Sequence, residues 1–182
     1  MDVLLFGVSN VGKSTTGRCL VEKLGYHYYD LDEEVKLHCH MTLEKFVNTI
    51  WPYERDKIRG EVLGNILAKG GNKVIAVTPI YYSRNFSKYL GSGDRLAVEL
   101  QDTPENIFER LVFSDENDRV YKDDEYRDAH RSHYLSEIKK DITYYKRSFA
   151  KIENKFQMNN DSPEVVANRL ISRFGLIVQE KE

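Results

Sequence analysis

The sequence predicts an α/β fold, a three-layer α/β/α sandwich around a central parallel sheet. Two observations predict it: apolar runs of strand length recur along the chain, and longer charged stretches of helical character separate them. Parallel strands need crossover connections of about a dozen residues or more, which these stretches supply. Because ligands bind such sheets at the carboxyl ends of the strands, the loops that follow the strands are where chemistry is expected.

The expected elements alternate along the chain. Strands are expected at residues 3–6, 26–29, 74–77 and 96–100, and helices at residues 13–24, 43–47, 54–69 and 104–113. A last helix begins near Pro163, because Ser162 supplies a cap residue, proline suits the first helical turn, and apolar residues follow at helical spacing.

Composition restricts the class of protein. The 182 residues fit one domain, residues 1–182, and 41% hydrophobic residues are enough for a core. A net charge of -2 gives no general attraction to nucleic acid or to an anionic membrane, so we expect neither partner. No apolar run approaches the roughly 20 residues of a membrane span, and two cysteines are too few for a disulfide framework. We therefore expect a cytoplasmic protein; its oligomeric state stays open.

A glycine-rich loop follows the first expected strand. Gly7-Val-Ser-Asn-Val-Gly12-Lys13-Ser14 matches the Walker A pattern G-x-x-x-x-G-K-[ST] without a mismatch. Its glycines let successive N–H groups, including those of Asn10 and Val11, converge on phosphate, and the following helix directs its positive end there. Lys13 would supply a mobile charge to the phosphates, and the hydroxyl of Ser14, or of Thr15 in its place, suits Mg²⁺. The loop therefore predicts binding of ATP with Mg²⁺.

Two carboxylates close the second expected strand. Asp30 and Asp32 stand at alternate positions, so in an extended segment they share one face beside the glycine-rich loop. One carboxylate could hold Mg²⁺ through its water shell, and the other could orient or deprotonate an acceptor hydroxyl. A surface strand end or a helix cap is the alternative explanation for such a pair.

A charged segment interrupts the alternation of strands and helices. Residues 114–131 are nearly free of aliphatic side chains and cannot contribute much core, so we expect them to be exposed and mobile. A solvated helix or loop is one explanation. A lid at about residues 114–135 that closes over a bound ligand is the other.

In these features the chain resembles the shikimate kinase family, small P-loop kinases of the nucleoside-monophosphate-kinase fold. The matching motifs, in the family's order, are Gly12-Lys13-Ser14, Leu24-Gly25, Asp30-x-Asp32, Thr42-Leu43-Glu44-Lys45-Phe46, the stretch from Pro104 to Leu111, and Ser162-Pro163-Glu164-Val165-Val166. The resemblance implies a P-loop NTPase fold and ATP-dependent transfer of the γ-phosphoryl group to a hydroxyl of a small metabolite.

The resemblance also implies roles for single residues. Asp30 would assist the metal, and Asp32 would bind the acceptor next to the hydroxyl that is phosphorylated. Arg110 and Pro163 would enclose adenine from two sides. Arg119 would come down with the lid and neutralise the charge of the transferring group.

The acceptor side departs from the family pattern. The family's Phe-Arg pair is absent, and Arg55 or Arg59, about one helical turn apart, could replace its substrate-binding arginine. A glycine triplet is replaced by Thr78-Pro79-Ile80-Tyr81-Tyr82. A further arginine of the family is missing from its place, with Arg131 or Arg147 as possible replacements.

Three functions therefore stay open. The first is a small-molecule kinase with shikimate as the first acceptor to test. The second is a kinase of the same fold acting on a sugar acid, another carbocyclic acid or a nucleotide. The third is a nucleotide-binding regulatory protein without transferase activity.

Overall fold

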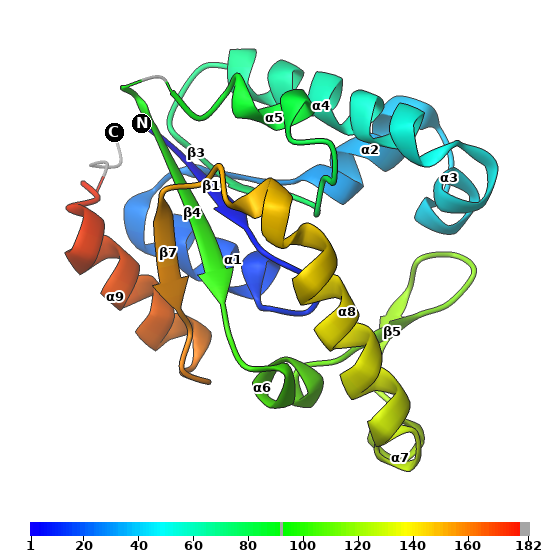
Figure 1. Ribbon diagram of the computed structural model, residues 1–182. Helices are drawn as coiled ribbons and strands as arrows, with labels where there is room; N and C mark the ends of the chain where they lie inside the picture. The colour runs from blue at the N-terminus through cyan, green and yellow to red at the C-terminus, as the bar shows by residue number, and fades with distance from the viewer. Residues whose placement is uncertain (92, 179–182) are drawn as a thin grey trace.

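The computed structural model describes residues 1–91 and 93–178 and shows a central sheet between layers of helices (Figure 1). Five parallel strands lie in the order β2-β3-β1-β4-β7. They are β1 (Asp2–Phe6), β2 (His27–Asp30), β3 (Lys73–Ala76), β4 (Arg95–Gln101) and β7 (Asn154–Gln157). The predicted three-layer α/β/α class is confirmed.

The helices fill the intervals between strands. They are α1 (Lys13–Leu24), α2 (Leu31–Cys39), α3 (Leu43–Thr49), α4 (Pro52–Ala68), α5 (Arg84–Ser87), α6 (Pro104–Glu109), α7 (Asp124–Ala129), α8 (Arg131–Phe149) and α9 (Pro163–Phe174). A separate antiparallel pair consists of β5 (Phe113–Ser114) and β6 (Val120–Tyr121). In Figure 1, α8 crosses in front of the sheet while α1 lies behind it, and α1 packs against α9.

The central strand is apolar from Val3 to Phe6. Residues 3–6 of β1 are buried, and the strand pairs with β3 on one side and β4 on the other, with Val3 opposite both Val74 and Leu96. Helices cover both faces of a parallel sheet, so its inner strands need apolar side chains in both directions. This core fixes the carboxyl end of β1, where the glycine-rich loop begins.

The four predicted strands are confirmed to within about one residue, but one helix differs from expectation. The helix expected at residues 104–113 ends at Glu109, because Phe113 and Ser114 pair with Tyr121 and Val120 instead.

A second correction concerns the two carboxylates. The extended conformation expected through Asp32 is wrong, because β2 ends at Asp30 and α2 begins at Leu31. Asp30 is the N-cap of α2, and its Oδ1 accepts a hydrogen bond from the Asp32 amide at 3.1 Å. The helix-cap alternative is therefore correct for Asp30. The cap, rather than strand alternation, brings the two carboxylates together.

The charged segment is built around a short hairpin. We call residues 113–121 the lid hairpin; its turn is closed by Asp115, whose Oδ1 accepts hydrogen bonds from the amides of Asn117 and Arg119. Asp118 adopts a φ of 60° at the tip. As expected, most of residues 114–131 are exposed, although Arg127 is buried against Glu109 and the ring of Phe108.

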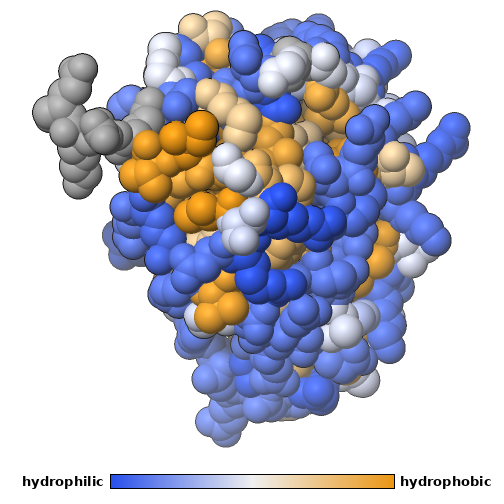
Figure 2. Space-filling model, turned by 90° about the vertical axis from the view of Figure 1, so that its left-hand side faces the viewer, coloured by the Kyte–Doolittle hydropathy of each residue, from blue (hydrophilic) through white to orange (hydrophobic). Residues whose placement is uncertain are grey.

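The face that carries α9 is mostly hydrophilic, with an apolar patch near the C-terminal end (Figure 2). Exposed apolar side chains toward this end of the chain include Val165, Ile177 and Val178. Among the residues that the structure describes, no helix has the length and apolar character that crossing a membrane requires.

Candidate active site

The glycine-rich loop joins β1 to α1 and bends through conformations that suit its residue types. Gly7 and Gly12 have φ values of 140° and 110°, and Asn10 has a φ of 60°. A Cβ on Gly7 would lie 2.7 Å from the Leu100 carbonyl oxygen, so a larger residue does not fit there. The fully buried side chain of Val11 anchors the loop in the core. This packing presets the cradle that the Walker A pattern predicted.

Lys13 lies across the loop. Its Nζ donates hydrogen bonds to the carbonyl oxygens of Gly7 and Val8, both at 2.9 Å. Burial lowers the pKa of Lys13 from 10.5 to about 8, although the nearby Asp32 and Asp30 oppose that shift. The ammonium is therefore charged at neutral pH and is held by weak carbonyl partners that a phosphate can replace.

Ser14 and Asp30 form a hydrogen-bonded pair beside Lys13. Ser14 Oγ donates to Asp30 Oδ2 at 2.7 Å, and the Tyr28 hydroxyl donates to the same oxygen at 3.2 Å. The hydroxyl of Thr15, the alternative to Ser14, does not bond to Asp30; its Oγ1 donates to the Gly12 carbonyl oxygen at 3.1 Å. The structure therefore favours Ser14 over Thr15 as the hydroxyl that faces Asp30.

Asp32 is buried next to this pair. Burial raises its pKa above the ordinary 3.8, and the Thr78 hydroxyl, Arg59 and Lys13 oppose the rise. Its Oδ1 has no hydrogen-bond partner of acceptable geometry among residues 1–91 and 93–178, and the same holds for Thr78 Oγ1. A buried oxygen without a partner is costly, which indicates that a ligand or water completes it.

Two cavities meet at Asp30 and Asp32. The first, which we call the P-loop cavity, has a volume of about 180 Å³ and is lined by Ser9, Asn10, Lys13, Ser14, Asp30, Asp32, Ala76, Thr78 and Pro79. The second, the hairpin cavity, has a volume of about 460 Å³ and lies between α2, α3 and the lid hairpin. The carboxylates thus separate a phosphate-sized space from a metabolite-sized space.

The candidate acceptor arginines lie on α4. Arg59 packs over the Phe46 ring at 5.6 Å from its centroid and approaches Asp56 with Nη1 3.5 Å from Oδ1. The Nε atoms of Arg55 and Arg59 are both buried without a hydrogen-bond partner in the described residues. Arg59 also acts electrostatically on Asp32. The structure therefore places Arg59 near the proposed reaction centre and leaves donors of both arginines free.

The loop after β3 is tied to α4 by Asp56. Asp56 is buried, and its Oδ2 accepts hydrogen bonds from the amides of Tyr81 and Tyr82 at 2.9 and 3.0 Å. Tyr81 stacks on Tyr144 with ring centroids 4.4 Å apart, and its carbonyl oxygen accepts a hydrogen bond from Ser148. The loop that replaces the family's glycine triplet is therefore clamped between α4 and α8.

Arg110 reaches the loop before α9. It pairs with Asp102, and its Nη1 donates to Asn160 Oδ1 at 3.3 Å, while the Asn160 amide donates to Asp102 Oδ2 at 3.2 Å. Pro163 opens α9 three residues later. This network brings the two predicted adenine residues to the same side of the molecule. Asp102, which anchors this network, was not predicted from the sequence. Its position just after β4 could have indicated it, because functional residues are expected in the loops that follow the strands.

The predicted lid arginine is not brought to the phosphate loop. Arg119 is exposed, and in the described part of the chain its side chain makes no ion pair or hydrogen bond. Its neighbour Asp118 is docked instead: Oδ2 accepts a hydrogen bond from the Leu43 amide at 2.8 Å and lies 3.9 Å from Lys36 Nζ. Docking of the hairpin by Asp118 gave no signal in the sequence.

The two replacement arginines lie elsewhere. Arg131 pairs with Glu109 at 3.3 Å and covers the Phe108 ring at the base of the lid. Arg147 lines a different cavity with Arg84. Neither is placed beside Asp32 by the contacts that the structure shows.

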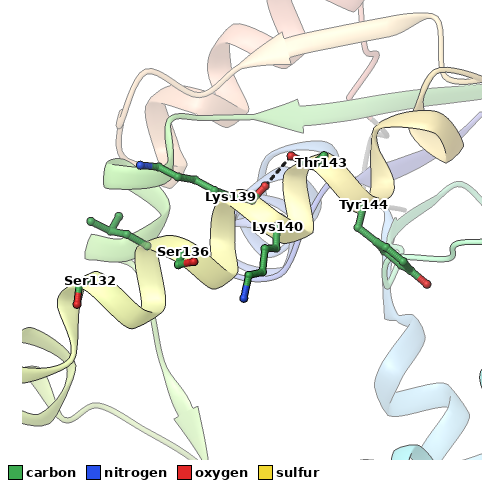
Figure 3. Close-up of a pocket in the computed structure, with 7 residues that line it drawn as sticks. Ser132, Ser136, Lys139, Lys140, Thr143 and Tyr144 are labelled. Atoms are coloured by element: carbon green, nitrogen blue, oxygen red, sulfur yellow. Dashed lines mark hydrogen bonds between the residues drawn. The ribbon is translucent and has the colours of Figure 1, made fainter.

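A larger cavity, of about 790 Å³, lies along α8, and none of the candidate site residues discussed above lines it. Figure 3 shows Lys140 and Tyr144 pointing to one side of the helix and Lys139 to the other. Thr143 Oγ1 donates to the Lys139 carbonyl oxygen at 2.9 Å within the helix. This cavity is lined by one helix and contains no carboxylate.

A parallel sheet with a Walker A loop, a Ser–Asp pair and a buried carboxylate at the carboxyl ends of its strands is the arrangement typical of P-loop small-molecule kinases. Comparison with known families agrees, because the family model described as shikimate kinase matches residues 9–174. The chain belongs to the shikimate kinase family.

Individual relatives support this assignment. The shikimate kinase of Persephonella marina is 27% identical over 179 residues, which cover 94% of this chain and 98% of the relative. A pentafunctional AROM polypeptide of Lodderomyces elongisporus is 28% identical over 149 residues, and there the match covers 74% of this chain but 10% of the relative's length. The solved shikimate kinase from Acinetobacter baumannii in complex with shikimate has a TM-score of 0.72 at 17% identity, covering 95% of this chain and 92% of that chain, and shares the fold.

Proposed function

We propose that this protein transfers the γ-phosphoryl group of ATP to a hydroxyl of shikimate. The observation that carries the proposal is the unpaired, buried Oδ1 of Asp32, which lies in the same cavity as Lys13 and Ser14. A carboxylate there can accept the proton of an acceptor hydroxyl within reach of a phosphate held by the loop.

On the donor side, the amides of the glycine-rich loop bind the phosphates of ATP. Lys13 leaves the carbonyl oxygens of Gly7 and Val8 and follows the charge of the γ-phosphate. Arg110 and Pro163 enclose the adenine ring, in agreement with the network that joins Arg110 to the loop before α9.

Ser14 and Asp30 are the residues that would hold Mg²⁺. Their oxygens lie 2.7 Å apart at the wall of the P-loop cavity, and a hydroxyl with one carboxylate suits an ion that completes its shell with phosphate oxygens and water. When bound, Mg²⁺ would supply positive charge that neutralises the phosphates.

On the acceptor side, Asp32 takes the proton as the acceptor oxygen forms its bond to the γ-phosphorus. The bond between that phosphorus and the bridging oxygen to the β-phosphate breaks, and ADP leaves with its electron pair. The free donors of Arg55 and Arg59 support an acceptor that carries a carboxylate, as shikimate does. Arg119 approaches when the lid hairpin adjusts to both ligands.

A second candidate is the same transfer to another hydroxylated acid. Pro79 has no N–H, and the amides of Tyr81 and Tyr82 are bound by Asp56, so this loop presents a different set of donors from a run of glycines. This favours a pocket whose preferred acceptor differs from shikimate in shape.

The test is acceptor-dependent ADP release with Mg·ATP, measured on shikimate, other carbocyclic hydroxy acids, sugar acids and nucleoside monophosphates. We expect saturable transfer to shikimate. Asp32→Asn should keep ATP binding by calorimetry and lose about 10²-fold or more in kcat, the usual size of a general-base contribution.

The control is Glu22→Gln, an exposed acid on α1 that lines neither cavity, which should keep activity. Preferred transfer to another acid would replace shikimate by the second candidate. ATP binding without transfer to any acceptor would support the regulatory alternative, and unchanged kcat in Asp32→Asn would remove the role of Asp32.

A further inference from the structure

Tyr28 places its hydroxyl on one of the two residues proposed to hold Mg²⁺. The hydroxyl donates a hydrogen bond to Asp30 Oδ2 at 3.2 Å, and the Ser14 hydroxyl donates to the same oxygen at 2.7 Å. The other oxygen, Oδ1, accepts from the Asp32 amide at 3.1 Å. The Ser14 donor belongs to the Walker A pattern and the Asp32 amide to the helix cap, whereas neither pattern requires a hydroxyl on Tyr28.

The ring of Tyr28 is packed so that this hydroxyl reaches Asp30. Tyr28 and Asp30 stand at alternate positions of β2, so both side chains leave the strand on the same face. A Cβ on Gly17 would lie 2.7 Å from Tyr28 Cε2, so a larger residue there would push the ring away. Arg18 places its Cζ 4.8 Å from the ring centroid, within the range of a cation–π contact. Packing of α1 against β2 therefore fixes where the hydroxyl lies.

The orientation of the Asp30 carboxylate matters for a metal ion. The terminal torsion of an aspartate is broad, so a carboxylate that nothing holds turns between orientations. A hydroxyl that donates to one oxygen uses one of its lone pairs, and the remaining lone pairs then keep a fixed direction. Hydrogen-bond partners of metal ligands typically account for about tenfold to a hundredfold in metal affinity or activity, because they hold the ligand in place.

We propose that Tyr28 is a positioning residue for the Mg²⁺ that accompanies the nucleotide: its hydroxyl holds the Asp30 carboxylate in the orientation that receives the ion. The proposal rests on the proposed function, which assigns Mg²⁺ to Ser14 and Asp30, and adds to it a residue that acts through Asp30. A phenylalanine at position 28 would keep the contact of the ring with Gly17, so the hydroxyl alone carries this role.

The test compares Tyr28→Phe with wild type in nucleotide binding. Calorimetry measures the Kd of the β,γ-imido analogue of ATP with EDTA and with saturating Mg²⁺, and the ratio of the two values gives the contribution of the metal. In Tyr28→Phe we expect this ratio to fall by about tenfold, the lower end of the usual cost of losing a partner of a metal ligand. The Kd in EDTA should stay within about twofold of wild type.

Tyr29→Phe is the matched control. Tyr29 is the next residue of β2, so its side chain leaves the strand on the opposite face, where Lys69 Nζ lies 4.4 Å from the ring centroid. The metal ratio of this variant should equal that of wild type. A fall as large as that in Tyr28→Phe would show that any change on β2 disturbs the site, and would overturn the inference.

A double-mutant cycle shows whether the hydroxyl acts through Asp30. Asp30→Asn keeps an oxygen for the Asp32 amide but removes the charge, so this change lowers the metal ratio by itself. In that background Tyr28→Phe should change the ratio by less than about twofold, since the carboxylate that it orients is gone. Kinetics gives a second readout: Tyr28→Phe should raise the Mg²⁺ concentration for half-maximal turnover about tenfold and keep kcat at saturating Mg²⁺ within about threefold.

Three further results would overturn the inference: an unchanged metal ratio in Tyr28→Phe, equal losses of affinity with Mg²⁺ and with EDTA, or the full loss in the Asp30→Asn background. A merely structural hydroxyl would lower the urea midpoint measured without metal and leave the ratio unchanged. The binding measurements need no acceptor. The role of Tyr28 can therefore fail in an enzyme that phosphorylates shikimate, and absence of transfer to any acceptor would remove the proposed function without changing the metal ratios.

Discussion

The carboxylate of Asp118, at the tip of the lid hairpin, accepts a hydrogen bond from the amide of Leu43 at 2.8 Å. Leu43 is the first residue of α3, so its amide has no partner within the helix and is available to the hairpin. Lys36 on α2 lies 3.9 Å from the same carboxylate. The hairpin is thus attached to the helices that enclose the hairpin cavity, even though the neighbouring Arg119 side chain makes no ion pair or hydrogen bond within residues 1–91 and 93–178.

Removing this attachment should loosen the lid. We expect Asp118→Ala to raise the acceptor KM and the acceptor-independent release of ADP, each by roughly fivefold, which corresponds to one hydrogen bond of about 1 kcal/mol. Asp118→Asn keeps an oxygen for the Leu43 amide and should lie between Ala and wild type. Steady-state kinetics with and without acceptor provides the measurement.

Glu116→Gln is the matched control, because Glu116 is an exposed acid of the same hairpin. It should behave as wild type. Equal kinetics for Asp118→Ala and Glu116→Gln would show that the contact does not position the lid.

Lys13 can be tested by Lys13→Met, which keeps the length of the side chain and removes its charge. Turnover should fall by about 10²–10³-fold or more, because a donor aimed at transition-state charge is lost. Stability should stay within about 1 kcal/mol of wild type, since the ammonium no longer has to be buried. Kinetics and urea unfolding measure the two effects, with Lys23→Met at the end of α1 as the control. A wild-type kcat would contradict the role of Lys13.

Asp102 should contribute stability that depends on pH. Burial would raise the pKa of Asp102, but hydrogen bonds from Arg110, Asn106 and the Thr103 amide outweigh it and hold the pKa below 3.8. The folded pKa is lower than the unfolded one, so this stabilisation is complete above the unfolded pKa and is lost as pH falls through the folded pKa.

At about pH 7, Asp102→Asn should therefore lower the free energy of unfolding by about 2–3 kcal/mol, because Arg110 loses a buried partner. As the pH falls below 3.8 and through the lowered pKa of folded Asp102, the difference from wild type should shrink. Urea unfolding across this range checks both points. Glu61→Gln, an exposed change on α4, should have little effect throughout, and a difference for Asp102→Asn that is independent of pH would contradict the electrostatic cause.

Gly60 allows α4 to approach the segment of α5. A Cβ on Gly60 would lie 2.5 Å from the Asn85 carbonyl oxygen, so Gly60→Ala must push the two elements apart. We expect a loss of about 1–3 kcal/mol, as in other overpacked sites. Gly70→Ala is the control, because a Cβ there meets no heavy atom within 4 Å. Thermal unfolding should separate the variants, and equal midpoints would contradict the close approach.

The fold could be predicted wherever the pattern is local. Apolar runs such as residues 3–6 and the Walker A loop are contiguous in sequence, and both lie where they were expected. β7 was not predicted, because of its four residues Phe156 alone is buried. The helix from Leu31 was missed because Asp30 both ends a strand and caps a helix.

The acceptor side could be predicted much less. The use of Arg55 or Arg59 depends on how α4 is turned against the sheet, which spacing does not reveal. Asp118 and Leu43 are 75 residues apart, and Asp56 is 25 residues from Tyr81. Such contacts depend on how helices and strands pack against one another. In the sequence, the polar residues that form these contacts cannot be distinguished from ordinary surface residues.

The binding of the Tyr81 and Tyr82 amides by Asp56 has a consequence for how this enzyme can change over time. Where a pocket offers main-chain N–H groups, its preference can be altered only by reshaping the backbone. Here Pro79 has no N–H and those two amides are taken, so under the proposed function selectivity would rest on side chains such as Arg55 and Arg59. Single substitutions exchange side chains without reshaping the backbone, so a kinase with this loop could change its acceptor while its ATP-binding half stays the same.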